Sequence, residues 1–368
     1  MEVTVQRDKF ARALGTVSRI AATAKTTLPV LSNVLIRAED DRLYLTTTNL
    51  ELAIVEYINA KIKTVGTITV PARLLAEFVQ NLSRGGEVKI KVEKNKMTVS
   101  EGKNRSTING IVADEFPELP EMDDKKAIKY KVSAVEFKDN ISKVAVCASS
   151  DLARPILTGV FFNTFEGNLY IAATDGYRLA EKRFIDGVKN EVKVVVPAVA
   201  LQEVMRSLTD EVEEIEILFS ETQAKFRIGD VEIISKIIDG SFPDYRQLIP
   251  KTSEVNLLVE KDELVRIVKL AALFAREVGG SIVFEAKKED SSLSVRAVAS
   301  EIGENDSEIA VEGDGDGKIT LNSKFVLDGL NVISDGKVRF GFSDKLAPAV
   351  IRGEKSQEYV HIIMPLKS

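Results

Sequence analysis

Apolar residues recur at helical spacing soon after the start of the chain. These positions are Phe10, Ala13, Leu14, Val17, Ile20 and Ala21. Side chains spaced three and four residues apart lie on one face of an α-helix, so the stretch predicts an amphipathic helix. The pattern then changes to apolar and β-branched residues between turn-forming ones. This second pattern predicts strands at 33–36, 43–47 and 52–58.

A second helix is predicted to begin at Pro71, because proline is tolerated in the first turn of a helix. It should end before Gly85 and Gly86, and a hairpin of strands at 88–92 and 96–100 should follow. The corresponding elements of the middle segment are helices at 134–148 and 197–208 and strands at 213–219 and 223–228. Each segment is therefore two helices against an antiparallel sheet, an α+β arrangement.

The chain repeats itself at a fixed interval. The segment from Leu28 to Val34 matches the segment from Arg154 to Val160, and their prolines are 155 − 29 = 126 residues apart. The later blocks that match at the same shift are Leu43-Tyr44-Leu45 with Leu169-Tyr170-Ile171, Val70-Pro71-Ala72 with Val196-Pro197-Ala198, and Glu115-Phe116-Pro117 with Ser241-Phe242-Pro243. Solenoid units are shorter, about 20–50 residues, so this shift indicates duplication of whole domains.

A third copy is fainter. The segment 319–327 resembles the earlier helix starts, with Asn322-Ser323 in place of Pro-Ala as helix-opening residues. Met364-Pro365 falls near the place of Phe242-Pro243, since 365 − 243 = 122. We therefore expect three domains at 1–124, 125–250 and 251–368.

Composition places the chain among globular proteins. Of its 368 residues 44% are hydrophobic, and no run of eighteen apolar residues occurs, so no transmembrane helix and no membrane association are expected. The start alternates like a strand and lacks the layout of a signal peptide. Cys147 is the only cysteine, which excludes an intrachain disulfide and fits a reducing cytoplasm.

The usual chemistry of enzymes is missing from the sequence. His361 is the only histidine and lies in an alternating strand pattern, where a structural role is favoured. Cys147 lies on an apolar helical stretch and is expected to be packed. Residues 312–317 faintly suggest a calcium loop but lack its twelfth-position glutamate, so a solvated turn is favoured. We expect no catalytic residue, metal or cofactor, although an unrecognised carboxylate site stays open.

Basic residues recur on the predicted helices. The candidates for facing DNA are Lys9, Arg12 and Arg19 in the first repeat, Lys138, Lys143 and Arg206 in the second, and Arg266 and Lys269 in the third. For any single helix a solvated face is the simpler interpretation, but repeated domains would bring such faces to one surface. The formal charge of −6 argues against nucleic-acid binding only as an average, because a ring can be acidic outside and basic along its bore.

Three motifs in this order resemble one family. They are residues 174–180 (Thr-Asp-Gly-Tyr-Arg-Leu-Ala), residues 240–245 (Gly-Ser-Phe-Pro-Asp-Tyr) and residues 362–366 (Ile-Ile-Met-Pro-Leu). With the early block at 27–31 they resemble the β subunit of bacterial DNA polymerase III, the sliding clamp, over the whole chain. The resemblance implies three clamp domains per protomer and a head-to-tail homodimer, which closes a ring with helices toward the bore and sheets outside.

The resemblance also implies a function without catalysis. Such a ring encircles double-stranded DNA without reading its sequence and acts as a processivity factor. Its partners would be the DNA polymerase III alpha subunit, the clamp loader, and other polymerases and repair proteins that carry clamp-binding peptides. A cytoplasmic location and no cofactor are expected.

A hydrophobic pocket between the middle and third domains is implied as the docking site for these peptides. Carried over by motif, its residues are Leu157, Thr174, Gly176, Tyr177, Arg178, Leu179, Pro243, Gln247, Leu248, Ile362, Met364, Pro365 and Leu366. Aliphatic and methionine side chains provide an adaptable apolar groove, and Arg178 is expected to offer polar contacts at its edge. Gln247 and Tyr177 depart from the family, which often has a basic residue and a histidine there.

Further positions follow from the same resemblance. Lys25 and Arg154 match DNA-contacting positions of the family. Leu273 and Phe274 resemble the third-domain contribution to the dimer interface, and Ile108 is a plausible partner from the first domain. Two other hypotheses stay open: a peptide-binding scaffold that never encircles DNA, and an enzyme with an unrecognised carboxylate site. The scaffold is favoured if the basic helix faces are scattered or paired with acids.

Overall fold

The computed structural model describes residues 1–21, 28–119, 122–343 and 346–366 of the chain. The chain divides into two compact units, and each is described by itself. Unit 1 comprises Met1–Phe137 and Val199–Ile237, and unit 2 comprises Lys138–Ala198 and Ile238–Ser368. No helix among the described residues is long and apolar enough to cross a membrane.

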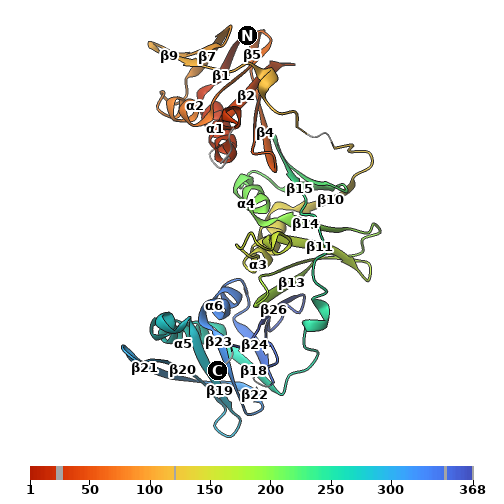
Figure 1. Ribbon diagram of the computed structural model, residues 1–368, viewed down its shortest axis with the longest axis vertical. Coiled ribbons are helices and arrows are strands. Elements are labelled where there is room, and N and C mark those ends of the chain that lie inside the picture. Colours follow the sequence, from red (N-terminus) through yellow and green to blue (C-terminus); the bar gives the residue numbers. More distant parts are fainter. Residues whose placement is uncertain (22–27, 120–121, 344–345, 367–368) are drawn as a thin grey trace. The chain divides into compact units, whose positions relative to one another are not determined.

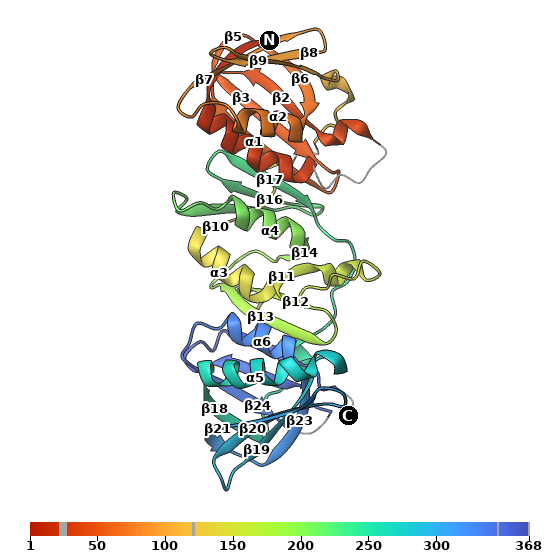
Figure 2. The ribbon, with the colours of Figure 1, turned by 90° about the vertical axis from the view of Figure 1, so that its left-hand side faces the viewer.

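Unit 1 contains two antiparallel sheets with helices on one side (Figures 1 and 2). Its helices are α1 (Arg7–Ala21), α2 (Ala72–Gln80) and, from its second residue on, α4 (Ala198–Ser207), while α3 (Ala134–Ala145) crosses the boundary between the units. Its strands are β1 (Glu2–Gln6), β2 (Asn33–Glu39), β3 (Arg42–Thr48), β4 (Leu52–Asn59), β5 (Lys61–Thr64), β6 (Gly66–Pro71), β7 (Glu87–Glu93), β8 (Lys96–Glu101), β9 (Asn104–Asn109), β10 (Ile128–Ser133), β15 (Glu214–Phe219), β16 (Gln223–Ile228) and β17 (Val231–Lys236). The strand orders are β5-β1-β7-β8-β9 and β10-β15-β16-β17-β4-β3-β2-β6.

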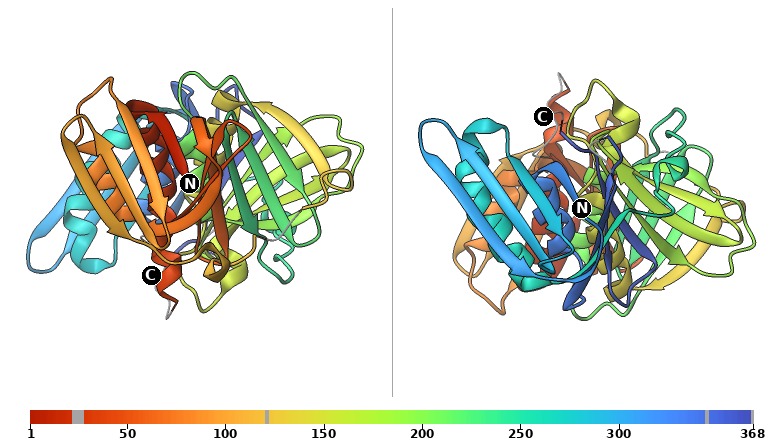
Figure 3. Two further views of the ribbon diagram at one scale, coloured as in Figure 1. Left: turned by 90° about the horizontal axis from the view of Figure 1, so that it is seen from above. Right: turned by 90° about the horizontal axis from the view of Figure 1, so that it is seen from below.

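Unit 2 has the same layering, with α5 (Lys261–Ala275) and α6 (Ser323–Asn331) in front of its strands in Figure 2. Its strands are β11 (Gly159–Phe165), β12 (Asn168–Thr174), β13 (Arg178–Ile185), β14 (Lys193–Pro197), β18 (Val255–Glu260), β19 (Ser281–Lys287), β20 (Ser292–Ala299), β21 (Gly303–Ala310), β22 (Glu312–Asp314), β23 (Gly317–Asn322), β24 (Lys337–Phe342), β25 (Ala349–Gly353) and β26 (Tyr359–Ile363). The orders are β14-β11-β12-β13-β26-β25-β24-β18-β22 and β21-β20-β19-β23. The left view of Figure 3 shows β1 and β7–β9 in red to orange, and the right view shows β19–β21 beside α5.

The amphipathic first helix forms as the apolar spacing predicts. All six apolar positions of its stripe are buried in α1, and Phe10, Leu14 and Val17 have no exposed surface. The helix packs this stripe on α2, β3 and β4. Because burying one large aliphatic or aromatic side chain stabilises a fold by about 1.5–3 kcal/mol, the stripe alone is a major part of this core.

The 126-residue shift appears in the structure as a one-to-one correspondence of strands. Adding 126 to the bounds of β2, β3 and β4 gives those of β11, β12 and β13. The short 3₁₀ turns at Pro29–Ser32 and Pro155–Thr158 correspond in the same way. The third repeat keeps the element order but not the interval, since β19 begins 281 − 159 = 122 residues after β11 and α6 begins 323 − 198 = 125 residues after α4. The sequence pattern therefore identified the repeats correctly, including the divergence of the third.

Several predicted boundaries were wrong by a few residues. Pro71 ends β6 instead of opening α2, because its ψ of 114° is extended and leaves it as the residue before the helix. Helix α3 ends at Ala145, three residues before the predicted end. Asn322 does open α6, and its side chain accepts a hydrogen bond from the Lys324 backbone N–H. The expected solvated turn begins instead with the exposed edge strand β22, paired to β18.

Candidate functional site

Three residues predicted for the pocket pack together in unit 2. Leu157, Leu179 and Ile362 belong to one buried apolar cluster, and the register of β13 and β26 places Leu179 opposite Ile362. The other buried members are Phe161, Ala172, Val195, Phe242, Tyr245, Val350 and Val360. We call this group the β13–β26 cluster. It joins a strand of the middle repeat to a strand of the third, and the binding of a peptide there stays a prediction.

Other predicted pocket residues leave apolar surface exposed next to the cluster. Tyr177 is 62% exposed, Leu248 52% and Met364 36%, and we call these three side chains the rim. Of the remaining predicted residues, Gly176, Pro243 and Gln247 are exposed, Pro365 and Leu366 are half-buried, and Thr174 is buried. Exposed large apolar side chains beside a buried apolar floor are typical of a surface that binds another chain.

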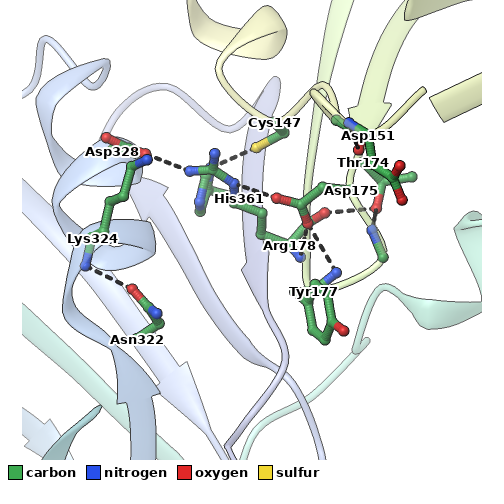
Figure 4. A network of polar contacts seen from close by, with 12 residues as sticks. Cys147, Asp151, Thr174, Asp175, Tyr177, Arg178, Asn322, Lys324, Asp328 and His361 are labelled. Atoms are coloured by element: carbon green, nitrogen blue, oxygen red, sulfur yellow. Dashed lines mark hydrogen bonds and ion pairs between the residues drawn. The ribbon is translucent and has the colours of Figure 1, made fainter. Parts of the chain in front are cut away.

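Hydrogen bonds fix the turn that carries Tyr177 (Figure 4). The Thr174 hydroxyl donates to the Arg178 carbonyl at 2.6 Å and accepts from the Gly176 N–H at 3.0 Å. Gly176 has φ of +92°, which favours glycine because a side chain would be strained there. The Met364 N–H donates to the Tyr177 carbonyl at 2.8 Å, so the C-terminal segment is attached to this turn.

Arg178 lies inside the protein and is engaged by two acids (Figure 4). Its side chain is 8% exposed and forms ion pairs with Asp175 at 2.9 Å and Asp328 at 2.5 Å, and its guanidinium lies 4.5 Å from the centre of the Phe325 ring. Burial acts to lower the pKa of Arg178, but the hydrogen bonds to both carboxylates outweigh it and raise the pKa. Arg178, which we expected to offer polar contacts at the pocket edge, therefore connects the middle repeat to α6 through its ion pair with Asp328. Its contact with a peptide stays a prediction.

The only histidine and the only cysteine are both buried in unit 2. His361 Nδ1 lies 3.1 Å from the Tyr359 hydroxyl and 3.7 Å from Cys147 Sγ. Burial, helped by the positive charge of Arg178, lowers the pKa of His361 to about 3. Burial also raises the pKa of the Cys147 thiol. A neutral imidazole and a protonated thiol without exposed surface are structural groups, as the sequence pattern favoured.

The basic residues of unit 1 lie on helices of one side (Figure 2). Lys9 and Arg12 are exposed on α1, and Arg12 approaches Glu211 only to 3.8 Å. Arg19 is half-buried and pairs with Glu203 of α4 at 2.7 Å. Arg206 pairs with the same glutamate, so two cations share one acid in this patch.

The remaining candidates vary in the same way. Lys143 pairs with Asp139 and Arg266 with Glu263, each at 2.6 Å. Lys138, Arg154 and Lys269 are exposed, and neither they nor Lys9 form an ion pair with any residue in the described parts of the chain. Lys25 lies outside the described residues.

Charge is nevertheless biased toward the helices. Taken together, the six α-helices within the described residues carry a formal charge of +4, most of it on α1. The whole chain carries −6, so the rest carries −6 − 4 = −10. The helices are thus more positive than the rest of the chain. This is the uneven charge distribution that the average charge of the sequence still allowed.

The residues expected at the dimer interface differ in exposure. Leu273 is 53% exposed on α5, and Phe274 beside it is half-buried. Ile108 is only 5% exposed, because it packs inside its own sheet opposite Met97. The backbone of its strand, β9, forms the open edge of the five-stranded sheet. An open edge of this kind can pair with another strand even where its side chains point inward.

Comparison with known proteins assigns this architecture. Sequence models of the DNA polymerase III beta subunit match in three consecutive parts: the N-terminal domain at residues 1–120, the central domain at 131–244 and the C-terminal domain at 246–367. The chain belongs to the DNA polymerase III beta subunit family. Members of this family are non-catalytic processivity subunits.

Relatives of this family match the chain over its full length. The beta sliding clamps of Staphylococcus aureus and Bacillus subtilis are each 29% identical, over 381 and 382 residues, with 100% of both chains covered. The crystal structure of the Pseudomonas aeruginosa DNA polymerase III subunit beta matches with a TM-score of 0.94 at 28% identity, covering 100% of both chains. The sliding clamp of the same organism bound to griselimycin matches with a TM-score of 0.93, also at 28% identity and with full coverage of both chains.

Sequence reasoning missed several residues of this beta-subunit site. Phe161 stacks on Phe242 with ring centres 4.7 Å apart, and Tyr245 meets both edge-on, so these aromatics form much of the cluster. Asp328 was also missed, although it pairs with Arg178. The sequence marked only some of these residues. Phe242 and Tyr245 belong to the motif at residues 240–245, whereas nothing distinguishes Asp328 from the other acids among the 56 acidic residues. No cluster of metal-ligating side chains occurs among the residues that the structure describes.

Proposed function

We propose that this protein is a sliding clamp that closes into a ring as a head-to-tail homodimer, encircles duplex DNA and tethers a polymerase to it. One observation carries the proposal: the sheets of neighbouring repeats join by one repeated junction, and the chain leaves both halves of a third such junction open. A second copy of the chain supplies the missing halves.

The junction has the same form both times. In unit 1, β4, the fourth strand of the first repeat, pairs antiparallel with β17, the last strand of the middle repeat. In unit 2, β13 corresponds to β4 and pairs antiparallel with β26, the last strand of the third repeat. Two strands equivalent to these junction strands lie at the edge of a sheet. They are β21, which corresponds to β4, and β9, which corresponds to β17. Antiparallel pairing of β21 with β9 of another copy would repeat the junction.

The register of the known junctions aligns complementary charges at this seam. Leu52 pairs with Ser235 at the start of β4, and the equivalent first residue of β21, Gly303, would pair with Ile108. Antiparallel continuation places Asp306 opposite Arg105, both exposed. The outward side of β21 also carries Glu304 and Glu308, so the acidic edge meets a basic one even if the register shifts by two residues.

Closure through two such seams gives six repeats around one axis. The proposed DNA-facing residues are those of the helices and nearby turns: Lys9, Arg12, Arg19, Lys25, Lys138, Lys143, Arg154, Arg206, Arg266 and Lys269. Contacts between such cations and phosphates are independent of sequence and weaken with salt, which suits a ring that slides. The formal charge of −10 outside the helices discourages binding of DNA to the outer surface.

The rim and the β13–β26 cluster are the proposed docking site for peptides of the DNA polymerase III alpha subunit, the clamp loader and other replication and repair proteins. The rim supports this role because Tyr177, Leu248 and Met364 expose apolar surface above a buried floor. The griselimycin-bound relative supports it further, since griselimycin binds a protein of the same fold. We place the protein in the cytoplasm and its domains at 1–124, 125–250 and 251–368.

A peptide-binding scaffold that does not encircle DNA is the second candidate. The observation that favours it is that Arg19, Lys143, Arg206 and Arg266 are paired with acids of their own chain. Paired cations attract phosphate less strongly than free ones, so a scaffold of this kind would hold DNA weakly, whereas a ring would stay on DNA by topology.

A topological experiment separates them. The protein is loaded by a clamp loader onto nicked circular DNA, the circle is cut with a restriction enzyme, and the protein bound to each form is measured by gel filtration. Retention on circles and loss from linear ends supports a ring. Equal retention on both forms contradicts encirclement, and binding of polymerase peptides in that case favours the scaffold.

A further inference from the structure

Unit 2 contains a hollow that the proposed function does not use. Its volume is about 280 Å³, and its wall includes Lys251, Ser253, Arg339, Val350 and Arg352. Val350 is also a member of the β13–β26 cluster. The hollow therefore begins where the buried floor of the proposed peptide site ends. We call it the arginine hollow.

Two arginines occupy directly opposed positions in its wall. The register of β24 and β25 places Arg339 opposite Arg352. Like charges at opposed positions of an antiparallel pair destabilise a sheet, because their β-carbons are only about 5 Å apart. Neither arginine forms an ion pair with any residue in the described ranges; the one hydrogen bond from the Arg352 side chain goes to the Gln357 carbonyl at 3.3 Å.

Two acids near these arginines, Glu312 and Glu181, are already engaged by other groups. Glu312, in the same cross-strand row through Leu258, pairs with Lys337 at 2.9 Å. Glu181 on β13 accepts a hydrogen bond from the Tyr245 hydroxyl at 2.5 Å and pairs with Arg246 at 2.9 Å. Burial lowers the pKa of Arg352, and the charge of Glu181 opposes this only in part. The protein thus holds two adjacent positive charges, and the carboxylates near them, Glu181 and Glu312, form their ion pairs with other cations.

The strand registers connect this charge to the rim. Leu179, Ile362, Val350 and Gly341 form one cross-strand row, and Arg352 and Arg339 lie two residues further along the last two strands. Residues two apart on a strand share a face of the sheet. Tyr177, directly before β13, precedes Leu179 of this row by two residues. The rim and the arginines are therefore four residues apart along the strand direction, about 13 Å, and β25 lies two strand spacings of about 4.8 Å from β13, so Tyr177 and Arg352 are about 16 Å apart.

We propose that the arginine hollow binds an acidic side chain of the same peptide whose apolar residues occupy the rim. Each guanidinium group carries several N–H donors in one plane, which suits a carboxylate held by paired charge-assisted hydrogen bonds, and the register brings two such residues to opposed positions. This inference rests on the proposed peptide site. It adds a specificity rule: a partner peptide carries Asp or Glu four to six residues from its apolar anchor. Partners without this acid bind through the anchor alone.

Fluorescence anisotropy with defined peptides tests the rule. The probe is a fluorescein-labelled dodecapeptide with two leucines and a phenylalanine at one end and a single Asp, or Asn as its neutral match, moved through the other positions. At low salt we expect the best Asp peptide to bind about tenfold more tightly than its Asn match, as one charge-assisted interaction provides. The advantage should disappear in Arg339→Gln with Arg352→Gln and persist in Arg296→Gln, which removes an exposed arginine of the same unit.

The outcomes separate this inference from the proposed function. Equal affinity for the Asp and Asn peptides at every position, with the anchor still required, overturns the arginine hollow and leaves the peptide site standing. Failure of every peptide to bind overturns both. Thermal unfolding provides a second check without peptide: Arg339→Gln relieves the opposed charges, so its melting temperature should be no lower than that of the parent, and a clear decrease contradicts the argument.

Discussion

Charge exchange at the proposed seam gives a sharp prediction about the ring. Asp306→Lys should weaken the dimer because it sets a cation opposite Arg105 of the other copy. Arg105→Glu should weaken it equally by setting two acids together. The double variant restores an opposite pair at each seam, so it should dimerise close to the parent level although both singles are impaired.

The magnitude follows from the exposure of both side chains and from the number of seams. An exposed cross-strand pair of opposite charges contributes about 0.2–1 kcal/mol, and a like pair costs a similar amount. Each reversal therefore changes one seam by about 1 kcal/mol. A closed dimer contains two identical seams, so the free energy of dimerisation changes by about 2 kcal/mol, which is about thirtyfold in Kd.

Sedimentation equilibrium at low and at high salt measures this change. The difference between single variants and parent should shrink at high salt, because exposed charges are screened there. Glu289→Lys, an exposed charge reversal outside β21, is the matched control and should leave Kd unchanged. A double variant that dimerises as poorly as the singles would refute the proposed pairing, whereas recovery cannot arise from general damage to either strand.

Other predictions concern the peptide site, the core and the DNA-facing helices. Met364→Ala with Leu179→Ala should weaken a polymerase peptide by at least tenfold in fluorescence anisotropy and leave sedimentation of the dimer unchanged. Arg178→Ala leaves two carboxylates without their partner and should lower the free energy of unfolding of unit 2 by about 3–5 kcal/mol in urea titrations. A loss below about 1 kcal/mol contradicts a structural role for these ion pairs. Burial holds the pKa of His361 at about 3, below its unfolded value of 6.5, so the unfolded chain binds the extra proton as pH falls between these values. Stability should accordingly fall by up to about 1.4 kcal/mol per pH unit in that window, and His361→Asn should flatten this slope in thermal melts. Lys9→Gln should reduce the salt dependence of DNA binding by about one unit of slope in filter-binding measurements, because the variant neutralises one phosphate fewer.

The repeats were predictable because their signal is long and redundant. Leu28–Val34 and Arg154–Val160 keep both their spacing and their chemistry, and the strands that follow them coincide at the same shift. Helix α1 was equally clear, since one face of it is wholly apolar. In the third repeat the helix start at Asn322 survived because capping is a local interaction between a side chain and a neighbouring backbone N–H.

Pairing between distant residues was not predictable from one sequence. Nothing near Arg178 indicates that Asp328, 328 − 178 = 150 residues later, would neutralise it, since many acids are equally suitable. Burial of Ile108 was hidden for a similar reason, because which face of β9 points inward depends on the register with β8. The opposition of Arg339 and Arg352 likewise depends on the loop between β24 and β25.

The junction between β4 and β17 has a consequence for how the chain folds during synthesis. The two strands are separated by 231 − 59 = 172 residues, so β4 leaves the ribosome long before its partner exists. Until then one edge of the first repeat is open and able to pair with another nascent chain. Truncation after the first repeat should leave that edge permanently uncovered, so such a fragment should aggregate more readily than the full-length chain. The middle repeat thus completes the sheet of the first repeat only after its own last strand, β17, has been synthesised.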